Sequence, residues 1–341
     1  MNLNIIGNGF DLYHGLPSSY YYFGCYLIKN DPEFYEAIGK MYELHYMKMV
    51  GPAIAHDYEH IVEDIFWSDF ESHLSRVDEY FVLESSIDDL GLEYSDPVEI
   101  ELEQDKSADL IKLNFAKWVR ETLDVDSNYS LINKNFAKKN WIEFSEEDYF
   151  IQFNYTHSLQ ELYGIDDDRI HYVNGECHGD DGGKLIVGHG NDDRIQEIKN
   201  KIEKLDGEYD FTQRSYNRRN EYQCLHVYLK KLGKNVNECI MICDYFYESL
   251  DDDIENVKIF GLSMGDVDLP YIYQIRERWP AAKWSFSFYD EDSIIHIEHV
   301  AKDYLKLEDN EFTLFEFKNT QSNEIRKEIV KQRMIEEVDW V

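Results

Sequence analysis

The sequence predicts an α/β protein, a Rossmann-like three-layer domain with a mostly parallel sheet and a large helical insertion. Three observations support this fold class. A short apolar run at residues 3–6 leads directly into the turn Gly7-Asn8-Gly9, as a buried strand does when a glycine turn joins it to a helix. Later apolar runs are short and rich in Ile, Val and Phe, as in strands buried on both faces of a parallel sheet. The long stretch between the first two runs has mostly helical spacing, and it is too long for one crossover.

Each expected element follows from one of these patterns. The expected strands are residues 3–6, 149–153, 170–173, 185–187, 257–261 and 284–289, with 312–315 as an edge strand. The expected helices are 32–49, 53–65, 68–80, 108–123, 237–250, 269–277 and 319–337, with 85–105 as an acidic loop containing a short helix and 195–235 helical in parts. Phe70, Leu74 and Val77, for example, recur at helical spacing. We therefore expect one α/β domain built from residues 1–30 and 145–315, a helical insertion at 31–140, and a C-terminal helix at 316–341.

The composition indicates a folded, strongly acidic protein. Of 341 residues, 43% are hydrophobic and 15% aromatic, which argues against disorder. The chain has 34 Lys and Arg against 69 Asp and Glu, so its net charge is −35. Such a surface repels a phosphate backbone, and direct nucleic-acid binding is disfavoured. Arg214, Arg218 and Arg219 form the one visible basic cluster, which we interpret as a solvated loop.

Cysteine usage and hydropathy predict a cytoplasmic protein. The five cysteines are odd in number and form no Cys-x-x-Cys pair, which fits a reducing compartment and gives no zinc-ligand spacing. We expect no bound metal. The start of the sequence lacks the pattern of a signal peptide, and no apolar run approaches the ~20 residues that span a bilayer.

The first candidate binding motif is the glycine turn itself. Gly7 and Gly9 adopt backbone angles closed to other residues and have no side chain to block a ligand. The backbone N–H groups of Gly7, Asn8, Gly9 and Phe10 are therefore predicted to contact a phosphate. Asp11 then accepts a ribose hydroxyl or caps the next helix. An ordinary tight turn without a ligand is the alternative.

Three more polar clusters follow expected strands, at the carboxyl ends where open parallel sheets bind ligands. Asn154, in Gln-Phe-Asn-Tyr-Thr-His, can position a ribose or a water molecule, or cap the helix after it. Asn174, in His-Tyr-Val-Asn-Gly-Glu, is a second amide at a strand end. His189 lies between two glycines, and we expect it on an exposed turn as a catalytic base or ligand contact.

The last cluster is Gly-Leu-Ser-Met-Gly-Asp-Val-Asp, which begins at Gly261. Gly261 and Ser263 are expected to contact the ligand, and Asp268 to bind it or cap the next helix. The same residues match Gly-x-Ser-x-Gly, the nucleophile turn of serine hydrolases, for which His296 or His299 lies downstream.

These motifs, taken in order, resemble the bacterial AbiH (bacteriophage abortive infection) family. The resemblance is carried by Gly-Asn-Gly-Phe-Asp-Leu-x-His-Gly-Leu-Pro, Phe-Asn-Tyr-Thr, Gly-His-Gly, Gly-x-Ser-x-Gly-x-x-Asp and Trp-Ser-Asp-Phe-Glu at 67–71. The spacing of Gly7, Gly9, Gly15 and Pro17 is also similar to that of sirtuin-like NAD-binding domains. That second resemblance implies a catalytic His where Asn174 stands, so the sirtuin mechanism does not transfer directly, since an amide is no general base.

The resemblance implies a phage-defence protein that binds NAD or a related nucleotide and hydrolyses it. The expected catalytic residues are Asn154, His189 and Asp11. The expected cofactor-binding residues are Gly7, Asn8, Gly9, Phe10, Gly15, Asn174, Gly261, Ser263 and Asp268. A non-catalytic nucleotide sensor or partner-binding module is the first alternative, a serine hydrolase the second, and a Mg²⁺-dependent nuclease the weakest. Expected partners are the nucleotide, a phage trigger and a second copy of the chain.

Overall fold

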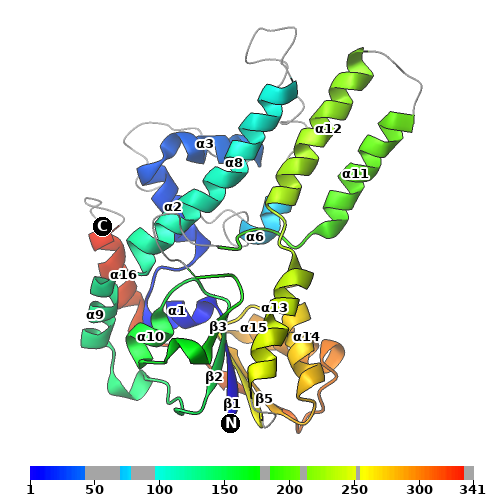
Figure 1. Ribbon diagram of the computed structural model, residues 1–341. Coiled ribbons are helices and arrows are strands. Elements are labelled where there is room, and N and C mark those ends of the chain that lie inside the picture. The colour runs from blue at the N-terminus through cyan, green and yellow to red at the C-terminus, as the bar shows by residue number, and fades with distance from the viewer. Residues whose placement is uncertain (43–69, 78–96, 177–184, 208–212, 251–253, 334–341) are drawn as a thin grey trace. The chain divides into compact units, whose positions relative to one another are not determined.

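The computed structural model describes residues 1–42, 70–77, 97–176, 185–207, 213–250 and 254–333 (Figure 1). The chain divides into two compact units. Unit 1 contains Met1–Ser19, Ala116–Ile186 and Asn235–Val341. Unit 2 contains Tyr20–Phe115 and Val187–Lys234. The two units are described separately below.

Unit 1 is built on a six-stranded parallel sheet of order β3-β2-β1-β4-β5-β6. The strands are β1 (Asn2–Ile6), β2 (Tyr149–Gln152), β3 (Ile170–Tyr172), β4 (Asn256–Phe260), β5 (Lys283–Phe288) and β6 (Phe312–Glu316). In this strand order the connections reverse direction between β1 and β4, and such a reversal opens the crevice where doubly wound sheets bind ligands.

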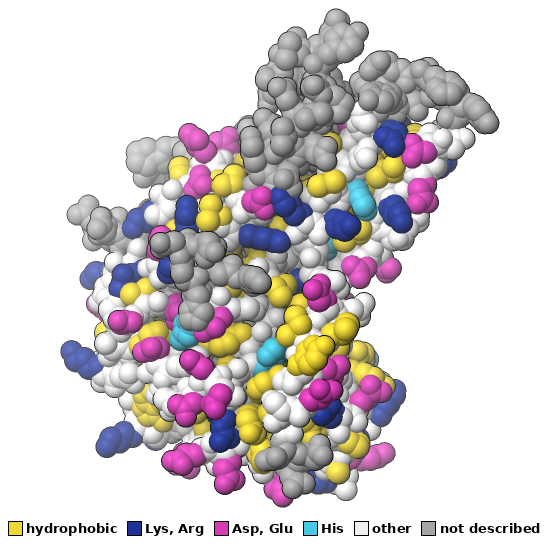
Figure 2. Space-filling model, in the orientation of Figure 1, with side chains coloured by type: hydrophobic (Ala, Val, Ile, Leu, Met, Phe, Trp, Pro, Cys, Tyr) yellow, Lys and Arg dark blue, Asp and Glu magenta, His cyan; other side chains and the backbone are white. Residues whose placement is uncertain are grey.

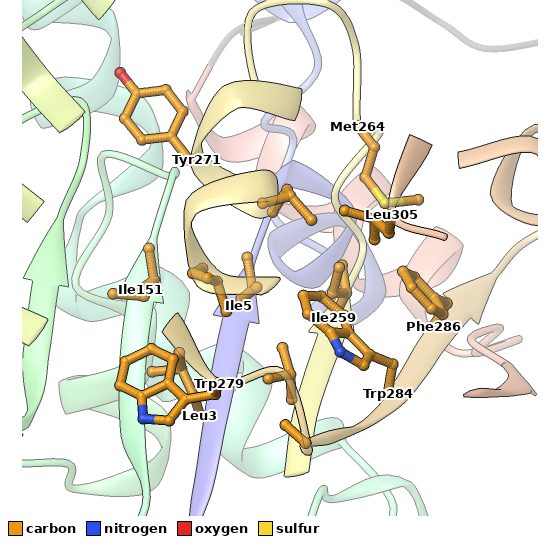
Figure 3. Packing of buried hydrophobic residues seen from close by; sticks show 14 of the residues in the cluster. Leu3, Ile5, Ile151, Ile259, Met264, Tyr271, Trp279, Trp284, Phe286 and Leu305 are labelled. Carbon is orange, nitrogen blue, oxygen red and sulfur yellow. The ribbon is translucent and has the colours of Figure 1, made fainter. Parts of the chain in front are cut away.

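Helices cover both faces of this sheet, so unit 1 has three layers. One face carries α13 (Val236–Ser249), α14 (Leu269–Arg278) and α15 (Glu291–His299); the other carries α1 (Asn8–His14), α9 (Asp126–Asn135), α10 (Ser158–Tyr163) and α16 (Ser322–Arg333). Leu3, Ile5 and Ile259 point from the central strands into the first face, where Trp284 and Phe286 pack beside them (Figure 3). Burial on both faces explains why the strands are nearly continuous apolar runs.

Unit 2 is helical in the part of the chain that the structure describes. Its elements are α2 (Tyr20–Asn30), α3 (Pro32–Met41), α6 (Phe70–His73), most of α8 (Pro97–Trp118), α11 (Asp192–Gly207) and α12 (Gln213–Lys231). Buried polar pairs fix its interior. Tyr42 hydrogen-bonds Tyr228 at 2.7 Å, and Lys234 pairs with Glu71 at 2.8 Å.

Six of the seven expected strands are confirmed, including the edge position of 312–315. The expected strand at 185–187 is wrong: these residues are irregular, and the nearest pairing is an isolated bridge between His189 and Gly233. A three-residue apolar run is too short to distinguish a strand from a buried loop. The loop expected at 85–105 is wrong from residue 97 on, where α8 begins.

Several expected helices lie partly or wholly outside the described residues. The helix at 53–65 is one of these, as are the ends of 32–49, 68–80 and 319–337. The helices expected at 237–250 and 269–277 are confirmed as α13 and α14.

Candidate functional site

The glycine turn after β1 packs directly against the turn after β4. A Cβ atom on Gly7 would lie 2.3 Å from Cα of Leu262. One on Gly261 would lie 2.4 Å from the carbonyl carbon of Gly9, and Gly261 also has a φ of 66°. Real Cβ contacts are never this short, so only glycine fits. Gly7, Gly9 and Gly261 are therefore required for backbone-to-backbone contact at the β1/β4 reversal.

The N–H groups of this turn are used within the protein. Gly7 donates to the carbonyl of Phe260 at 2.9 Å, and Gly9 donates to that of Gly261 at 2.7 Å. Phe10 donates to the Gly7 carbonyl at 2.9 Å. The expectation that these three N–H groups contact a phosphate therefore needs correction, because each already has a backbone acceptor. The side chain of Asn8 is exposed beside them.

Gly15, expected to bind the cofactor, ends helix α1 instead. It adopts a left-handed φ of 96°, and its N–H reaches the carbonyls at the end of that helix, as in many helix C-termini. A Cβ there would lie 2.8 Å from the side chain of Ile325 in α16. Neighbouring His14 is fully buried, with Nδ1 bonded to the Phe10 carbonyl and Nε2 to the hydroxyl of Tyr163. Burial lowers the pKa of His14 to about 4, so it is a neutral core residue.

Both candidate amides brace neighbouring turns. The Asn154 amide donates to the Gly7 carbonyl at 3.0 Å, which ties the end of β2 to the glycine turn. The Asn174 amide donates to the Phe153 carbonyl at 2.8 Å, which ties the end of β3 to that of β2. Both side chains are buried. Their NH₂ groups thus fix the carboxyl edge of the sheet.

Asp11 is a buried carboxyl group at this edge. Its Oδ2 accepts a hydrogen bond from the Thr156 hydroxyl at 2.7 Å, while Oδ1 has no hydrogen-bond partner among the described residues. Burial raises the pKa of Asp11 to about 6, and the charge of Asp124 acts in the same direction. The polar side chains of Ser158, Thr156 and Asn154 oppose this rise. Asp11 is 1% exposed.

Beside Asp11, a histidine lies between two carboxylates. Nδ1 of His157 contacts Asp124 at 2.5 Å, and Nε2 contacts Glu176 at 2.7 Å. The backbone N–H of His157 also donates to Asp124, at 2.9 Å, and Tyr129 donates its hydroxyl to the same oxygen at 2.5 Å. The side chains of His157, Asp124 and Glu176 are 18%, 12% and 29% exposed, so solvent reaches this group.

The charges of this group follow from its contacts. Burial lowers the pKa of His157, but the hydrogen bonds and charges of Asp124 and Glu176 outweigh burial and raise it to about 9. Burial would raise the pKa of Asp124, but hydrogen bonds from His157 and Tyr129 hold it below its ordinary value. At neutral pH His157 is therefore an imidazolium whose two N–H groups both donate.

Sequence reasoning included His157 and Glu176 in motifs but gave neither a role, and it did not identify Asp124. Asp124 follows a π-helix, Val119–Leu123, and such irregular turns are frequent at functional sites. Glu176 follows Gly175, whose φ of 79° turns the chain after β3. The usable signal was a histidine just after a strand, with acidic residues after other elements. We call Asp11, Asp124, Thr156, His157 and Glu176 the carboxylate cluster.

His189 differs from its expected place. It is 1% exposed and belongs to unit 2, so the expectation of an exposed turn is wrong. Its Nε2 bonds the Leu229 carbonyl at 3.0 Å, and its Nδ1 accepts from the Asn191 N–H at 3.2 Å. Burial lowers its pKa. Close packing requires a glycine at position 188, because a Cβ on Gly188 would overlap the Leu232 carbonyl oxygen.

The turn after β4 carries the remaining candidates. Ser263 is exposed, and Asp268 lies at the start of α14 without a capping hydrogen bond from its side chain. His296 bonds the Met264 carbonyl at 3.2 Å and not the Ser263 hydroxyl. Of the non-glycine residues in this turn, Met264 has the positive φ, 53°. A serine-hydrolase turn needs its strain and its histidine at the serine, and this geometry does not provide them.

Metal ligands and membrane spans were the other features considered for the described residues. Within them, no group of three or more His, Cys, Asp or Glu side chains has a metal-binding arrangement. In the same part of the chain, no helix combines the length and apolar character that a membrane span requires. Asp and Glu side chains are spread over the face in view in Figure 2, as the net charge predicts.

Comparison with known proteins gives one match. The family model described as "Bacteriophage abortive infection AbiH" matches residues 3–288. Searches of curated proteins and of solved structures found no match.

Proposed function

Because this chain belongs to the AbiH family of bacteriophage abortive infection proteins, we propose that it acts in phage defence by binding NAD or a related nucleotide and hydrolysing its glycosidic bond. The observation that carries the proposal is the carboxylate cluster at the carboxyl ends of β1, β2 and β3. Doubly wound parallel sheets bind their ligands at this edge.

The cluster suits glycosidic cleavage because that reaction develops positive charge on the sugar. Its transition state resembles an oxocarbenium ion, which nearby carboxylates stabilise. Asp11, Asp124 and Glu176 supply negative charge at one edge of the sheet, with His157 as the one cation among them. The positive charge of the nicotinamide ring of NAD passes to the ribose as the glycosidic bond breaks. Carboxylates beside the ribose therefore stabilise the transition state more than they stabilise bound NAD.

Asp11 is the proposed general base. A base works best when its pKa lies near the operating pH, and the pKa of Asp11 is about 6. Its Oδ1 is a buried acceptor that has no hydrogen-bond partner among the described residues. Since Asp11 is buried, we expect a water molecule, and not the sugar, to reach this oxygen. Asn154, which lies beside Asp11 and holds the glycine turn, positions that water. His189 has no part in this proposal.

The test is incubation of purified protein with NAD, alone and with lysate from phage-infected cells, with nicotinamide release followed by chromatography. We expect release in at least one condition and its loss in Asp11→Asn and Asn154→Ala. Glu161→Gln is the control, since it removes an exposed carboxylate of α10 outside the cluster. No release under either condition overturns the hydrolase proposal.

A non-catalytic nucleotide sensor is the second candidate. One specific observation favours it: the amides of Asn154 and Asn174 both donate to backbone carbonyls. These hydrogen bonds stabilise turns and require no catalysed reaction. A sensor and an enzyme both raise their melting temperature when NAD binds, but only the enzyme consumes NAD. A thermal shift with intact NAD therefore assigns the sensor.

A further inference from the structure

We propose that Glu176 competes with a pyrophosphate oxygen of the nucleotide for the Nε2–H of His157, so that this histidine is the anion-binding donor of the site. The inference rests on the proposed function for the identity of the ligand. It also supplies what the glycine turn lacks, because three N–H groups of that turn already have backbone acceptors.

The direction of Nε2 does not depend on Glu176. Asp124 contacts Nδ1 of His157 at 2.5 Å and accepts its backbone N–H at 2.9 Å. Tyr129 donates to Asp124 from the following helix, α9. Two contacts to one carboxylate fix both the ring and its backbone. If the Glu176 carboxylate moves, the imidazolium still presents Nε2–H in the same direction.

Glu176 is the more exchangeable of the two carboxylates. Its side chain is 29% exposed, against 12% for Asp124. It follows Gly175, which adopts a left-handed φ, and Asn174, whose amide is anchored on Phe153. The hydrogen bond of Asn174 holds the backbone two residues before Glu176, and the Glu176 side chain extends from that fixed turn. Ion pairs that solvent reaches contribute little free energy, so we expect an anion of equal charge to displace Glu176.

Charge balance selects a phosphodiester. Each phosphate of a pyrophosphate diester carries one negative charge, so the phosphate that takes the place of Glu176 at Nε2 replaces one negative charge with one. The second charge lies on the neighbouring phosphate, farther from His157. A phosphomonoester carries about −1.5 to −2 at neutral pH and would add negative charge beside Asp11 and Asp124. The site is therefore expected to prefer the linked phosphates of a dinucleotide or ADP-ribose over a terminal phosphate.

The experiment measures binding of ADP-ribose, which has the pyrophosphate but no nicotinamide to lose, by isothermal titration calorimetry. In Glu176→Gln the competing charge is gone, and we expect ADP-ribose to bind roughly three- to fivefold more tightly, the scale of a partly exposed ion pair. Binding of ribose 5-phosphate should gain less, and that of adenosine should not change. His157→Gln should bind ADP-ribose more weakly, and the control Glu161→Gln should match the wild type.

A second readout follows His157 directly. ADP-ribose should shift the ¹⁵N resonance of its Nε2 and not that of fully buried His14. Unchanged or weaker ADP-ribose binding in Glu176→Gln overturns the inference, as does an absence of binding to both proteins. The two proposals fail separately. Nicotinamide release without the Glu176 effect leaves the hydrolase standing alone, whereas the Glu176 effect without release leaves an anion-binding sensor.

Discussion

His157 and His189 occur in similar sequence settings but have opposite physical states. Each lies just after an apolar run, in a motif with small or polar neighbours. In unit 1, two carboxylates hold His157 charged and partly exposed. In unit 2, His189 is buried and neutral, with both ring nitrogens bonded to backbone groups. The difference shows that a histidine's role depends on the groups that its nitrogens contact. A carboxylate makes it a cation available for ligands, whereas backbone partners on both nitrogens make it a structural link.

The largest effect should come from removing the structural histidine. His189→Ala empties the volume of a buried imidazole and removes the partner of the buried Leu229 carbonyl and of the Asn191 N–H. We expect a loss of about 2–4 kcal/mol in the free energy of unfolding, measured by urea denaturation. Hydrogen exchange at the Asn191 amide should accelerate.

The matched control for this change is His226→Ala, a partly exposed histidine on α12 of the same unit. It should cost less than about 1 kcal/mol. Equal free energies of unfolding for His189→Ala and wild type would show that His189 is not a structural residue.

Removing the Asp11 charge from the carboxylate cluster should raise the free energy of unfolding, whereas removing His189 lowers it. The pKa of Asp11 is raised in the folded protein to about 6 from 3.8. Its stabilising contribution is therefore complete below pH 3.8 and is lost as the pH rises through 6. At pH 8 the buried charge opposes folding, so Asp11→Asn should raise the free energy of unfolding by about 1–2 kcal/mol.

The same Asp11→Asn protein should release no nicotinamide. A gain in stability with a loss of activity is the signature of a residue retained for function. If Asp11→Asn were less stable at pH 8 than at pH 5 relative to wild type, the carboxyl group would be structural, like His189.

Most of the fold could be predicted from the sequence, for a local reason. Strands buried on both faces need contiguous apolar residues, so β1, β2 and β4 are visible as runs. The turn glycines could also be identified in the sequence, but the reason that each must be glycine could not. Each packs against backbone from a distant segment of the chain. Gly7 meets Leu262, and Gly188 meets Leu232.

The carboxylate cluster could not be predicted in the same way. Its central contacts join His157 to Asp124, 33 residues earlier, and to Glu176, 19 residues later. Asp124 belongs to no recognised motif. Glu176 ends the motif that contains Asn174, but nothing in that motif indicates a contact with His157. For His189 the error had the opposite origin. The neighbouring glycines indicated an exposed turn, whereas Gly188 allows the turn to pack closely inside unit 2.

The third prediction uses pH to separate the two histidines. The pKa of His157 is raised to about 9 from 6.5, so its contribution to stability is complete below pH 6.5 and is lost as the pH rises through 9. The pKa of His189 is lowered, so its contribution is complete above pH 6.5 and is lost as the pH falls. Across pH 6.5–9, His157 should account for roughly 1 kcal/mol, because solvent screens its ion pairs.

This prediction is checked by unfolding wild type and His157→Gln at several pH values between 6 and 10. The difference in stability between them should shrink as the pH rises. A difference that is constant with pH would mean that His157 is not charged in the folded protein.

The smallest effect tests how the two carboxylates share His157. Asp124 accepts from both Nδ1 and the backbone N–H of this residue and is the less exposed partner, whereas Glu176 contacts Nε2. Glu176→Gln should therefore lower the pKa of His157 by about half a unit, and Asp124→Asn by more than that. Titration of the imidazole resonances by NMR measures both shifts, with fully buried His14 as the internal reference that stays neutral. A larger shift from Glu176→Gln than from Asp124→Asn would reverse the assignment: Glu176 would be the fixed partner, and Asp124 the one that a ligand displaces.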